Sequence, residues 1–223
     1  MPETYIDLSH TIKDGEITYQ GLPAPLICDF ISREQSADSY DDGSTFQIAR
    51  IDMVSNTGTY IDCPFHRYED GKDLAETELA AFADLPGILI DAAFEDHLAI
   101  DASFFEGKAV RGKAVLVHTG WSRLWQTDAY FGAHPYLTKD AAEYLRDQGA
   151  KLVGIDAYNI DNTKGKARPV HSILLGEEIL IVEHLTNLAA LRGKSFSFSA
   201  IPPKIEGMGT FPVRAFAKIL THV

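Results

Sequence analysis

The sequence predicts a mixed α/β fold made of one domain, residues 1–223, in which a few helices pack on a mixed β-sheet. Short apolar runs bounded by turn residues, which are typical of buried strands, outnumber the segments with helical periodicity. The two kinds of segment do not alternate regularly along the chain, as they would in a doubly wound parallel sheet. The length suits one large domain, and no linker, internal repeat or low-complexity tract divides it.

The individual elements follow from these patterns in chain order. Strands are predicted at residues 5–9, 46–54, 87–91, 114–118, 152–156, 179–183 and 195–201, with loops or turns at 13–25 and 38–44. Asp73 and Glu76 have the spacing of a capping box, which predicts a short helix that runs towards Ala83. A second helix is expected between Thr138, a capping residue, and Gly149.

Composition and charge exclude several classes of protein. The formal net charge of -12 argues against nucleic acid as a partner, because nucleic acid selects basic surfaces, and it suits a protein that binds a small molecule. No apolar run approaches the ~18–20 residues that a membrane span needs. The first residues do not have the pattern of a signal peptide, and Cys28 and Cys63 are too few for a disulfide framework. These observations predict a cytoplasmic protein.

One segment concentrates polar groups of catalytic potential, and it reads Asn56-Thr57-Gly58-Thr59-Tyr60-Ile61-Asp62-Cys63-Pro64-Phe65-His66. If the chain stays extended there, the even-numbered residues from Asn56 to Asp62 point to one face, because side chains of a strand alternate with period two. Pro64 interrupts strand pairing, and His66 follows directly. We therefore expect an amide, a phenol, a carboxylate and an imidazole within reach of one pocket.

This segment resembles the signature of the cyclase and kynurenine formamidase-like metal-dependent hydrolases, which reads His-x-Gly-Thr-His-x-Asp-x-Pro-x-His. The matching positions are Gly58, Thr59, Asp62, Pro64 and His66. The other two histidines, which bind metal in that family, are replaced by Asn56 and Tyr60. The resemblance covers nearly the whole chain and implies the swivelling β/β/α fold of the family.

A second segment, residues 171–188, resembles the other metal-binding segment of the family and matches it at His171 and Glu183. The resemblance implies that Asp62, His171 and Glu183 bind metal. It assigns acid/base work to His66, which suits an imidazole that titrates near neutrality. It also implies that a loop containing Tyr19 covers the substrate. The remaining residues expected near the substrate or behind the ligands are Asn56, Thr59 and Arg67.

The two replaced histidines leave three hypotheses for the cofactor. In the first, one divalent ion (Mn, Zn or Fe) is held by Asp62, His171 and Glu183, a ligand set that suits such ions. In the second, no metal binds, and Asn56 and Tyr60 donate hydrogen bonds to the two carboxylates. In the third, two ions remain with weaker ligands, because an amide oxygen or a protonated phenol binds zinc less well than imidazole does.

The leading functional hypothesis is a hydrolase of a small amide, formamide, cyclic amide or lactone, similar to the arylformamidases of tryptophan catabolism. Water activated by a metal or by His66 would attack the carbonyl carbon, and Tyr60 would donate a hydrogen bond to the developing oxyanion. One alternative is a metal-free binding module, in which the site is a degenerate enzyme site. Another is a metal-independent lyase or isomerase that uses Tyr60 and His66 as an acid/base pair.

Structural interpretations of the same residues stay open. Asp62 could bond a neighbouring threonine hydroxyl in a turn, and Gly58 could only kink the strand. The resemblance also implies a homo-oligomer, a dimer or tetramer, with the N-terminal loop near a neighbour's pocket. The aromatic residues expected at the surface, and therefore at such an interface, are Trp121, Trp125, Tyr130 and Phe131.

Overall fold

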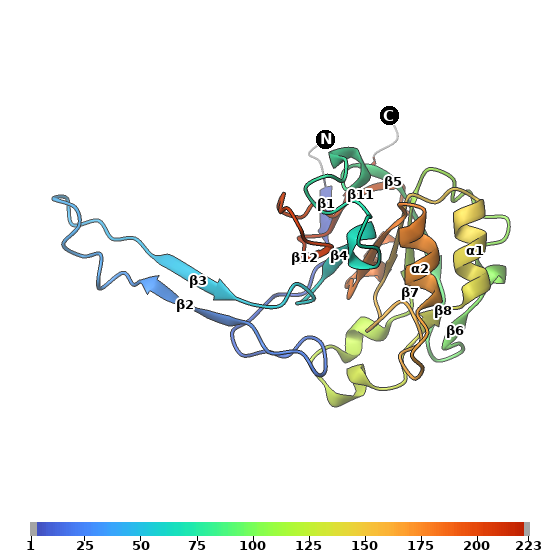
Figure 1. The fold of residues 1–223 in the computed structure, drawn as a ribbon, viewed down its shortest axis with the longest axis horizontal. Helices are drawn as coiled ribbons and strands as arrows, with labels where there is room; N and C mark the ends of the chain where they lie inside the picture. Colours follow the sequence, from blue (N-terminus) through green and yellow to red (C-terminus); the bar gives the residue numbers. More distant parts are fainter. Residues whose placement is uncertain (1–3, 221–223) are drawn as a thin grey trace.

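The structure, a computed structural model, describes residues 4–220 and is organised around one nine-stranded mixed sheet (Figure 1). Across the sheet the strands are β1 (Thr4–Asp7), β13 (Phe216–Ile219), β11 (Phe196–Ser199), β5 (Leu85–Asp91), β7 (Ala114–His118), β9 (Leu152–Ile155), β10 (Leu180–Glu183), β4 (Tyr60–Asp62) and β12 (Thr210–Pro212). The four strands from β5 to β10 are parallel to one another, and the flanking pairs are antiparallel. The mixed α/β fold predicted from the sequence is confirmed.

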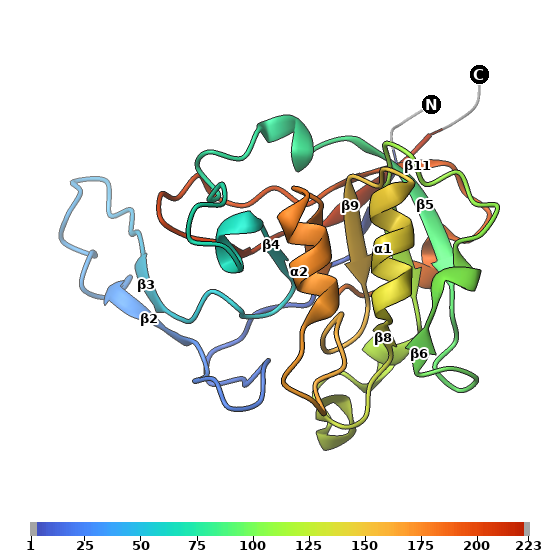
Figure 2. The same ribbon diagram turned by 45° about the vertical axis from the view of Figure 1, so that its right-hand side comes forward.

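The central parallel strands are buried on both faces, which explains why they read as continuous apolar runs. Helices α1 (Lys139–Asp147) and α2 (Pro169–Gly176) lie over one face of the sheet, as Figure 2 shows. In β7, Val115 and Val117 belong to the core cluster on this face. Leu116 of the same strand joins a second cluster on the opposite face, together with side chains of β11 and β13. The two cores fix the sheet, and with it the side chains at the ends of β4 and β10.

Shorter elements complete the body. Single 3₁₀ turns lie at Pro64–His66, Leu79–Ala81, Ala102–Phe104, Trp121–Leu124, Asp128–Phe131 and Leu188–Leu191, and β6 (Ala99–Ile100) pairs with β8 (Tyr136–Leu137). Within residues 4–220, no helix combines the length and the apolar character that crossing a membrane requires.

Most predicted elements are confirmed, apart from shifts of one or two residues at their ends. They are the strands at 5–9, 87–91, 114–118, 152–156, 179–183 and 195–201 and the helix that follows Thr138. The helix expected from Asp73 to Ala83 is wrong. The capping-box hydrogen bonds between Asp73 and Glu76 do form, but the Asp73 carboxylate also accepts a hydrogen bond from the Gly207 N–H. The box therefore ties two loops together, and the chain continues in tight turns.

The strand predicted at residues 46–54 forms as β3 (Ile48–Asp52), but it does not enter the core. It pairs with β2 (Leu26–Ile31), which the sequence analysis missed, and this hairpin, the arm, projects from the body in Figure 1. All residues of β3 are exposed. Gly58 turns the chain with a φ of +66° before β4 begins, so the predicted alternation holds only from Tyr60 to Asp62.

The prediction of surface aromatic residues is wrong for Trp121 and Tyr130. Both are buried in the helix-side core, and the Trp121 indole N–H donates to the Tyr130 carbonyl oxygen at 3.1 Å. Trp125 and Phe131 are half-buried against the same core. The 3₁₀ turns at these residues fold back on the sheet, which the local sequence does not reveal.

Candidate active site

The register of two antiparallel strands brings Tyr60, Asp62 and Glu183 together. Glu183 at the end of β10 is the direct partner of Tyr60 in β4, and paired side chains lie on the same face. Asp62 lies two residues further along β4 and therefore faces the same way. The phenol O–H of Tyr60 donates to Glu183 Oε2 at 2.5 Å.

Asp62 is fully buried, and its two carboxylate oxygens have different surroundings. Its Oδ1 accepts a hydrogen bond from the hydroxyl of Thr210, which is the register partner of Asp62 in β12. Its Oδ2 has no hydrogen-bond partner among residues 4–220. A buried carboxylate oxygen that is left unpaired is costly, so this atom marks a place for a ligand such as a cation.

His171 reaches the same point from the first turn of α2. Asp161 accepts hydrogen bonds from the backbone N–H groups of Val170 and His171, and it therefore caps the helix. The same carboxylate lies 2.6 Å from His171 Nδ1, which leaves Nε2 directed at the site. A histidine ligand whose second nitrogen is held by a carboxylate is the usual arrangement in metal sites.

Three groups thus converge on one small volume. His171 Nε2 lies 3.8 Å from Asp62 Oδ2 and 3.7 Å from Glu183 Oε1. Ligand atoms of Asp62, His66 and His171 also lie within 4.8 Å of one another. Two carboxylates and imidazole nitrogens at these separations fit one divalent ion.

The protonation of the site follows from its burial and its charges. Burial alone lowers the pKa of His171, but the Asp161 hydrogen bond and the nearby carboxylates outweigh it and raise the pKa to about 9. Burial raises the pKa of Glu183 to about 7, although the charge of His171 and the bonds from Tyr60 and Ile160 oppose this. A bound cation would replace the proton of His171, because a metal ligand must be deprotonated.

His66 lies at the edge of the same pocket, and its tautomer can be assigned from its hydrogen bonds. The Thr210 hydroxyl has a single proton and donates it to the Asp62 carboxylate. At 2.8 Å, His66 Nδ1 must therefore donate to the Thr210 oxygen. Nε2 of neutral His66 then carries the lone pair, as a general base requires. Residue 209 must be glycine for its loop to pack this closely against His66, because a Cβ at that position would lie 2.2 Å from the His66 backbone nitrogen.

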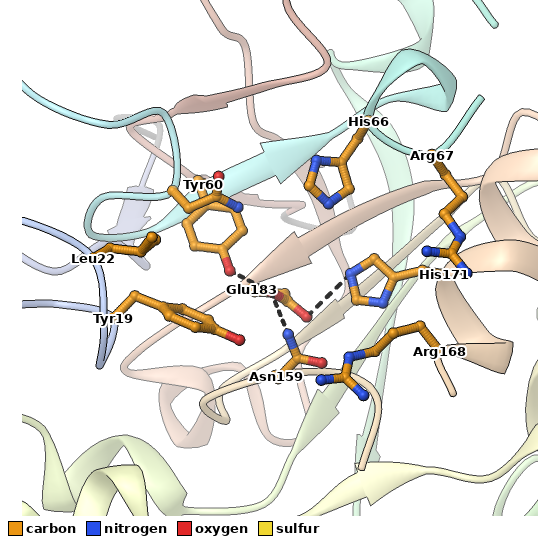
Figure 3. A pocket seen from close by; sticks show the side chains of 10 residues that line it. Tyr19, Leu22, Tyr60, His66, Arg67, Asn159, Arg168, His171 and Glu183 are labelled. Carbon is orange, nitrogen blue, oxygen red and sulfur yellow. Dashed lines mark hydrogen bonds and ion pairs between the residues drawn. The ribbon is translucent and has the colours of Figure 1, made fainter. Parts of the chain in front are cut away.

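A cavity of about 270 Å³ opens above these groups (Figure 3). Its lining residues are Tyr19, Leu22, Asn56, Tyr60, His66, Arg67, Asn159, Arg168, His171 and Glu183. In Figure 3, Tyr19 and Leu22 lie at one side, Arg67 and Arg168 lie at the other, and Glu183 lies between them. The size and the mixture of apolar and polar groups suit a small organic molecule.

The structure brings most of the residues proposed from the sequence into this pocket. Tyr19, Asn56 and Arg67 line the cavity together with Tyr60, His66, His171 and Glu183, and Asp62 lies buried beneath them. Thr59 is not part of the lining. Its hydroxyl donates to the His184 carbonyl and accepts from the His10 N–H, which clips two loops together.

Four further residues of the site were missed from the sequence, and they are Thr210, Asp161, Asn159 and Arg168. Thr210 and Asp161 orient His66 and His171, and the Asn159 amide lies 3.4 Å from Glu183. Asp161 and Asn159 belong to a stretch of turn residues in the sequence, which gave a weak signal. No local pattern distinguishes Thr210.

The geometry also bears on the three cofactor hypotheses. Tyr60 does donate to Glu183, as the metal-free hypothesis requires, but the Asn56 side chain bonds Ser55 and not a site carboxylate. Asp62 Oδ2 consequently has no hydrogen bond among the described residues and only the longer contact with His171. Tyr60 fills the place beside Glu183 with a phenol whose pKa lies well above its usual value because of burial and the Glu183 charge. The described residues therefore offer good ligands for one ion rather than for two.

The fold and the site together define an enzyme with a mixed α/β fold and a buried carboxylate–histidine centre. The sequence profile of the putative cyclase family matches residues 6–162, and the chain belongs to this family. Among similar proteins, the kynurenine formamidase of Bacillus cytotoxicus is 26% identical over 217 residues, which cover 97% of this chain and 98% of that protein. The kynurenine formamidase of Erythrobacter litoralis is 29% identical over 174 residues, 74% of each chain.

Solved structures share the fold along almost the whole chain. A potential metal-dependent hydrolase with cyclase activity superposes with a TM-score of 0.80 at 25% identity, covering 99% of this chain and all (100%) of that one. Isatin hydrolase A from Labrenzia aggregata superposes with a TM-score of 0.83 at 21% identity, covering 98% and 94%. At that identity the second likeness concerns the fold alone.

Proposed function

We propose that the protein hydrolyses the C–N bond of a small amide, an aryl formamide or a cyclic amide, at a centre that holds one divalent ion. The observation that carries this proposal is the unpaired, buried Asp62 Oδ2 that faces His171 Nε2, with a correctly protonated His66 beside it. The kynurenine formamidases among its relatives support the reaction class.

The residues have separate tasks in this reaction. Asp62, His171 and Glu183 would hold the ion, which would polarise the substrate carbonyl and lower the pKa of water. His66 Nε2 removes a proton from water as the oxygen bonds to the carbonyl carbon. It returns this proton to the leaving nitrogen as the C–N bond breaks, which yields an acid and an amine. Thr210 keeps the other nitrogen of His66 protonated throughout.

Tyr60 has a different task from the one expected from the sequence. Its single hydroxyl proton lies on the bond to Glu183, so it has no proton to offer to an oxyanion. We propose that Tyr60 positions Glu183 and closes the space beside it.

Metal removal tests the proposed function. We expect protein purified without chelators to hydrolyse formanilide or a cyclic anilide, and EDTA followed by dialysis to abolish this activity. Adding Mn²⁺ or Zn²⁺ should restore it, because the ligand set suits both ions. Hydrolysis that survives complete metal removal would indicate that His66 activates water without a metal, and the absence of both metal and turnover would indicate a binding module.

We propose that the protein is a homo-oligomer, and that the arm rather than the aromatic residues around Trp121 forms the contact. Apolar side chains protrude from both strands of the arm, and they are Leu26, Phe30, Ile48 and Ile51. A two-stranded hairpin without packing is marginally stable in water, so a second copy that covers it would stabilise both. Large exposed apolar patches typically mark such interfaces.

Substitution of the arm tests this assembly. We expect the parent protein to scatter light as a dimer or tetramer at micromolar concentration, and Phe30→Glu combined with Ile51→Glu to give monomers. Leu79→Glu is the matched control, since Leu79 is 64% exposed, close to the 67% of Phe30, but lies on the body. A monomeric parent protein, or unchanged mass in the arm variant, would refute the proposal.

We further propose that residues 1–223 work as one domain in the cytoplasm. The pairing of β1 with β13, from opposite ends of the chain, supports a single folding unit. Cys28 on the arm and the buried Cys63 are both free thiols, which is ordinary for a reducing compartment.

A further inference from the structure

We infer that Arg67 and Arg168 form an anion subsite at the rim of the active-site cavity, so that the preferred amide substrate carries a carboxylate. This inference rests on the proposed function, because it names a substrate class for the same pocket. Both arginines line the cavity, and in Figure 3 they lie on either side of His171, across from Tyr19 and Leu22.

Each arginine is held in place through only part of its hydrogen-bonding capacity. Arg67 Nε donates to Ser172 Oγ at 3.1 Å. Arg168 uses Nη1 alone, which donates to the carbonyl oxygens of Asn162, Gly165 and Ala167 at 3.2, 2.8 and 2.8 Å. Because a guanidinium has five N–H donors, each side chain keeps donors for a ligand while its position is fixed.

Neither arginine serves to neutralise the acidic centre by direct pairing. In the part of the chain that the structure describes, neither one forms an ion pair with a carboxylate. The carboxylates of the centre have other partners: Asp161 bonds the first turn of α2, and Glu183 accepts from Tyr60 and Ile160. Two guanidinium groups without anionic partners among the described residues therefore line the cavity of a protein whose net charge is -12. A planar guanidinium group can donate two parallel hydrogen bonds to one carboxylate.

The two sides of the cavity determine where the aryl ring, the carboxylate and the scissile carbonyl of the substrate lie. Tyr19 stacks on Tyr158 with 4.5 Å between ring centroids and, with Leu22, presents an apolar side to an aryl ring. A carboxylate directed to the opposite side meets the arginines. The scissile carbonyl then lies over the centre and the ring spans the cavity.

Paired substrates test the subsite. We expect the parent protein to have a kcat/KM about 10- to 100-fold higher for a carboxylate-bearing aryl formamide than for formanilide, mostly through KM. Arg67→Gln should remove most of this ratio, and Arg67→Lys should keep part of it, because a point charge replaces a bidentate fork. Arg168→Gln should act in the same direction, but it also removes the bonds that hold the loop at 162–168. The decisive variant is therefore Arg67→Gln.

Lys164→Gln with Lys166→Gln is the matched control, since it takes two positive charges from the loop next to Arg168 without changing the cavity lining. This variant should keep the substrate ratio. A parent ratio near one, or an unchanged ratio in Arg67→Gln, would overturn the inference while the hydrolase function stands.

Ligand binding separates failure of the subsite from failure of the proposed function. Calorimetry should show tighter binding of benzoate than of benzamide to the parent protein, weakened by salt and lost in Arg67→Gln. If no amide is hydrolysed but this preference is present, the proposed function fails and the subsite stands. If benzoate and benzamide bind alike, the subsite fails whatever the catalytic result.

Discussion

His66→Ala should lower kcat for amide hydrolysis by ~10²–10⁴ while the fold and the metal content stay unchanged, because it removes the proposed general base. His66 is about one-third exposed (34% of its side chain), so its loss leaves no cavity in the core. The measurement is steady-state kinetics on formanilide, together with circular dichroism and metal analysis. His97→Ala is the control, since His97 is exposed and lies outside the cavity.

Metal content decides between two roles of His66, because its ring lies close enough to Asp62 and His171 to act as a ligand. If His66→Ala loses the metal together with activity, His66 is a ligand and the base must be sought elsewhere. Near-native activity in this variant would mean that the residue is structural.

Substitution of Thr210 tests whether this residue positions the His66 imidazole for proton transfer. Thr210→Val removes the oxygen that accepts from His66 Nδ1, whereas Thr210→Ser retains it. If Thr210 only fills space, the serine variant should be the more damaged of the two. If it positions the imidazole, the pH profile should shift in the valine variant and recover in the serine variant.

Much of the fold could be predicted because local patterns determine it. The run from Ala114 to His118 is apolar throughout since both faces of β7 are buried, and this pattern needs no tertiary information. The arm shows the opposite case. Ile48 and Ile51 have the composition of a core strand, but Gly58 turns the chain before it reaches the sheet. Nothing within the strand itself distinguishes an exposed arm from a buried edge.

Some residues of the candidate site could likewise be predicted from a local motif, and others could not. Residues in and near β4, such as Tyr60, Asp62 and His66, could be proposed because they lie in one short motif. Thr210 could not be proposed, because it lies 148 residues after Asp62 in the chain. Only the register of β12 with β4 brings the two residues together. Register depends on the assembled sheet, and the sequence around Thr210 carries no trace of it.

Asp62→Asn should abolish metal binding and hydrolysis together, and it is the most direct test of the centre. Asparagine keeps the shape of the side chain and an oxygen for the Thr210 hydroxyl, but it replaces the unpaired Oδ2 and removes the buried charge. An ion whose free concentration is 100 times its Kd stabilises the folded protein by about 2.7 kcal/mol. For a chain of this size, this corresponds to a rise in Tm of about 5–10 °C.

The parent protein should show this rise on addition of Mn²⁺ or Zn²⁺, and Asp62→Asn should show almost none. Differential scanning fluorimetry with and without metal measures the effect independently of any substrate. Asp73→Asn is the matched control, because Asp73 is also buried and hydrogen-bonded but joins two loops away from the cavity. A metal-induced rise that persists in Asp62→Asn would place the ion elsewhere, and the unpaired oxygen of Asp62 would then need another explanation.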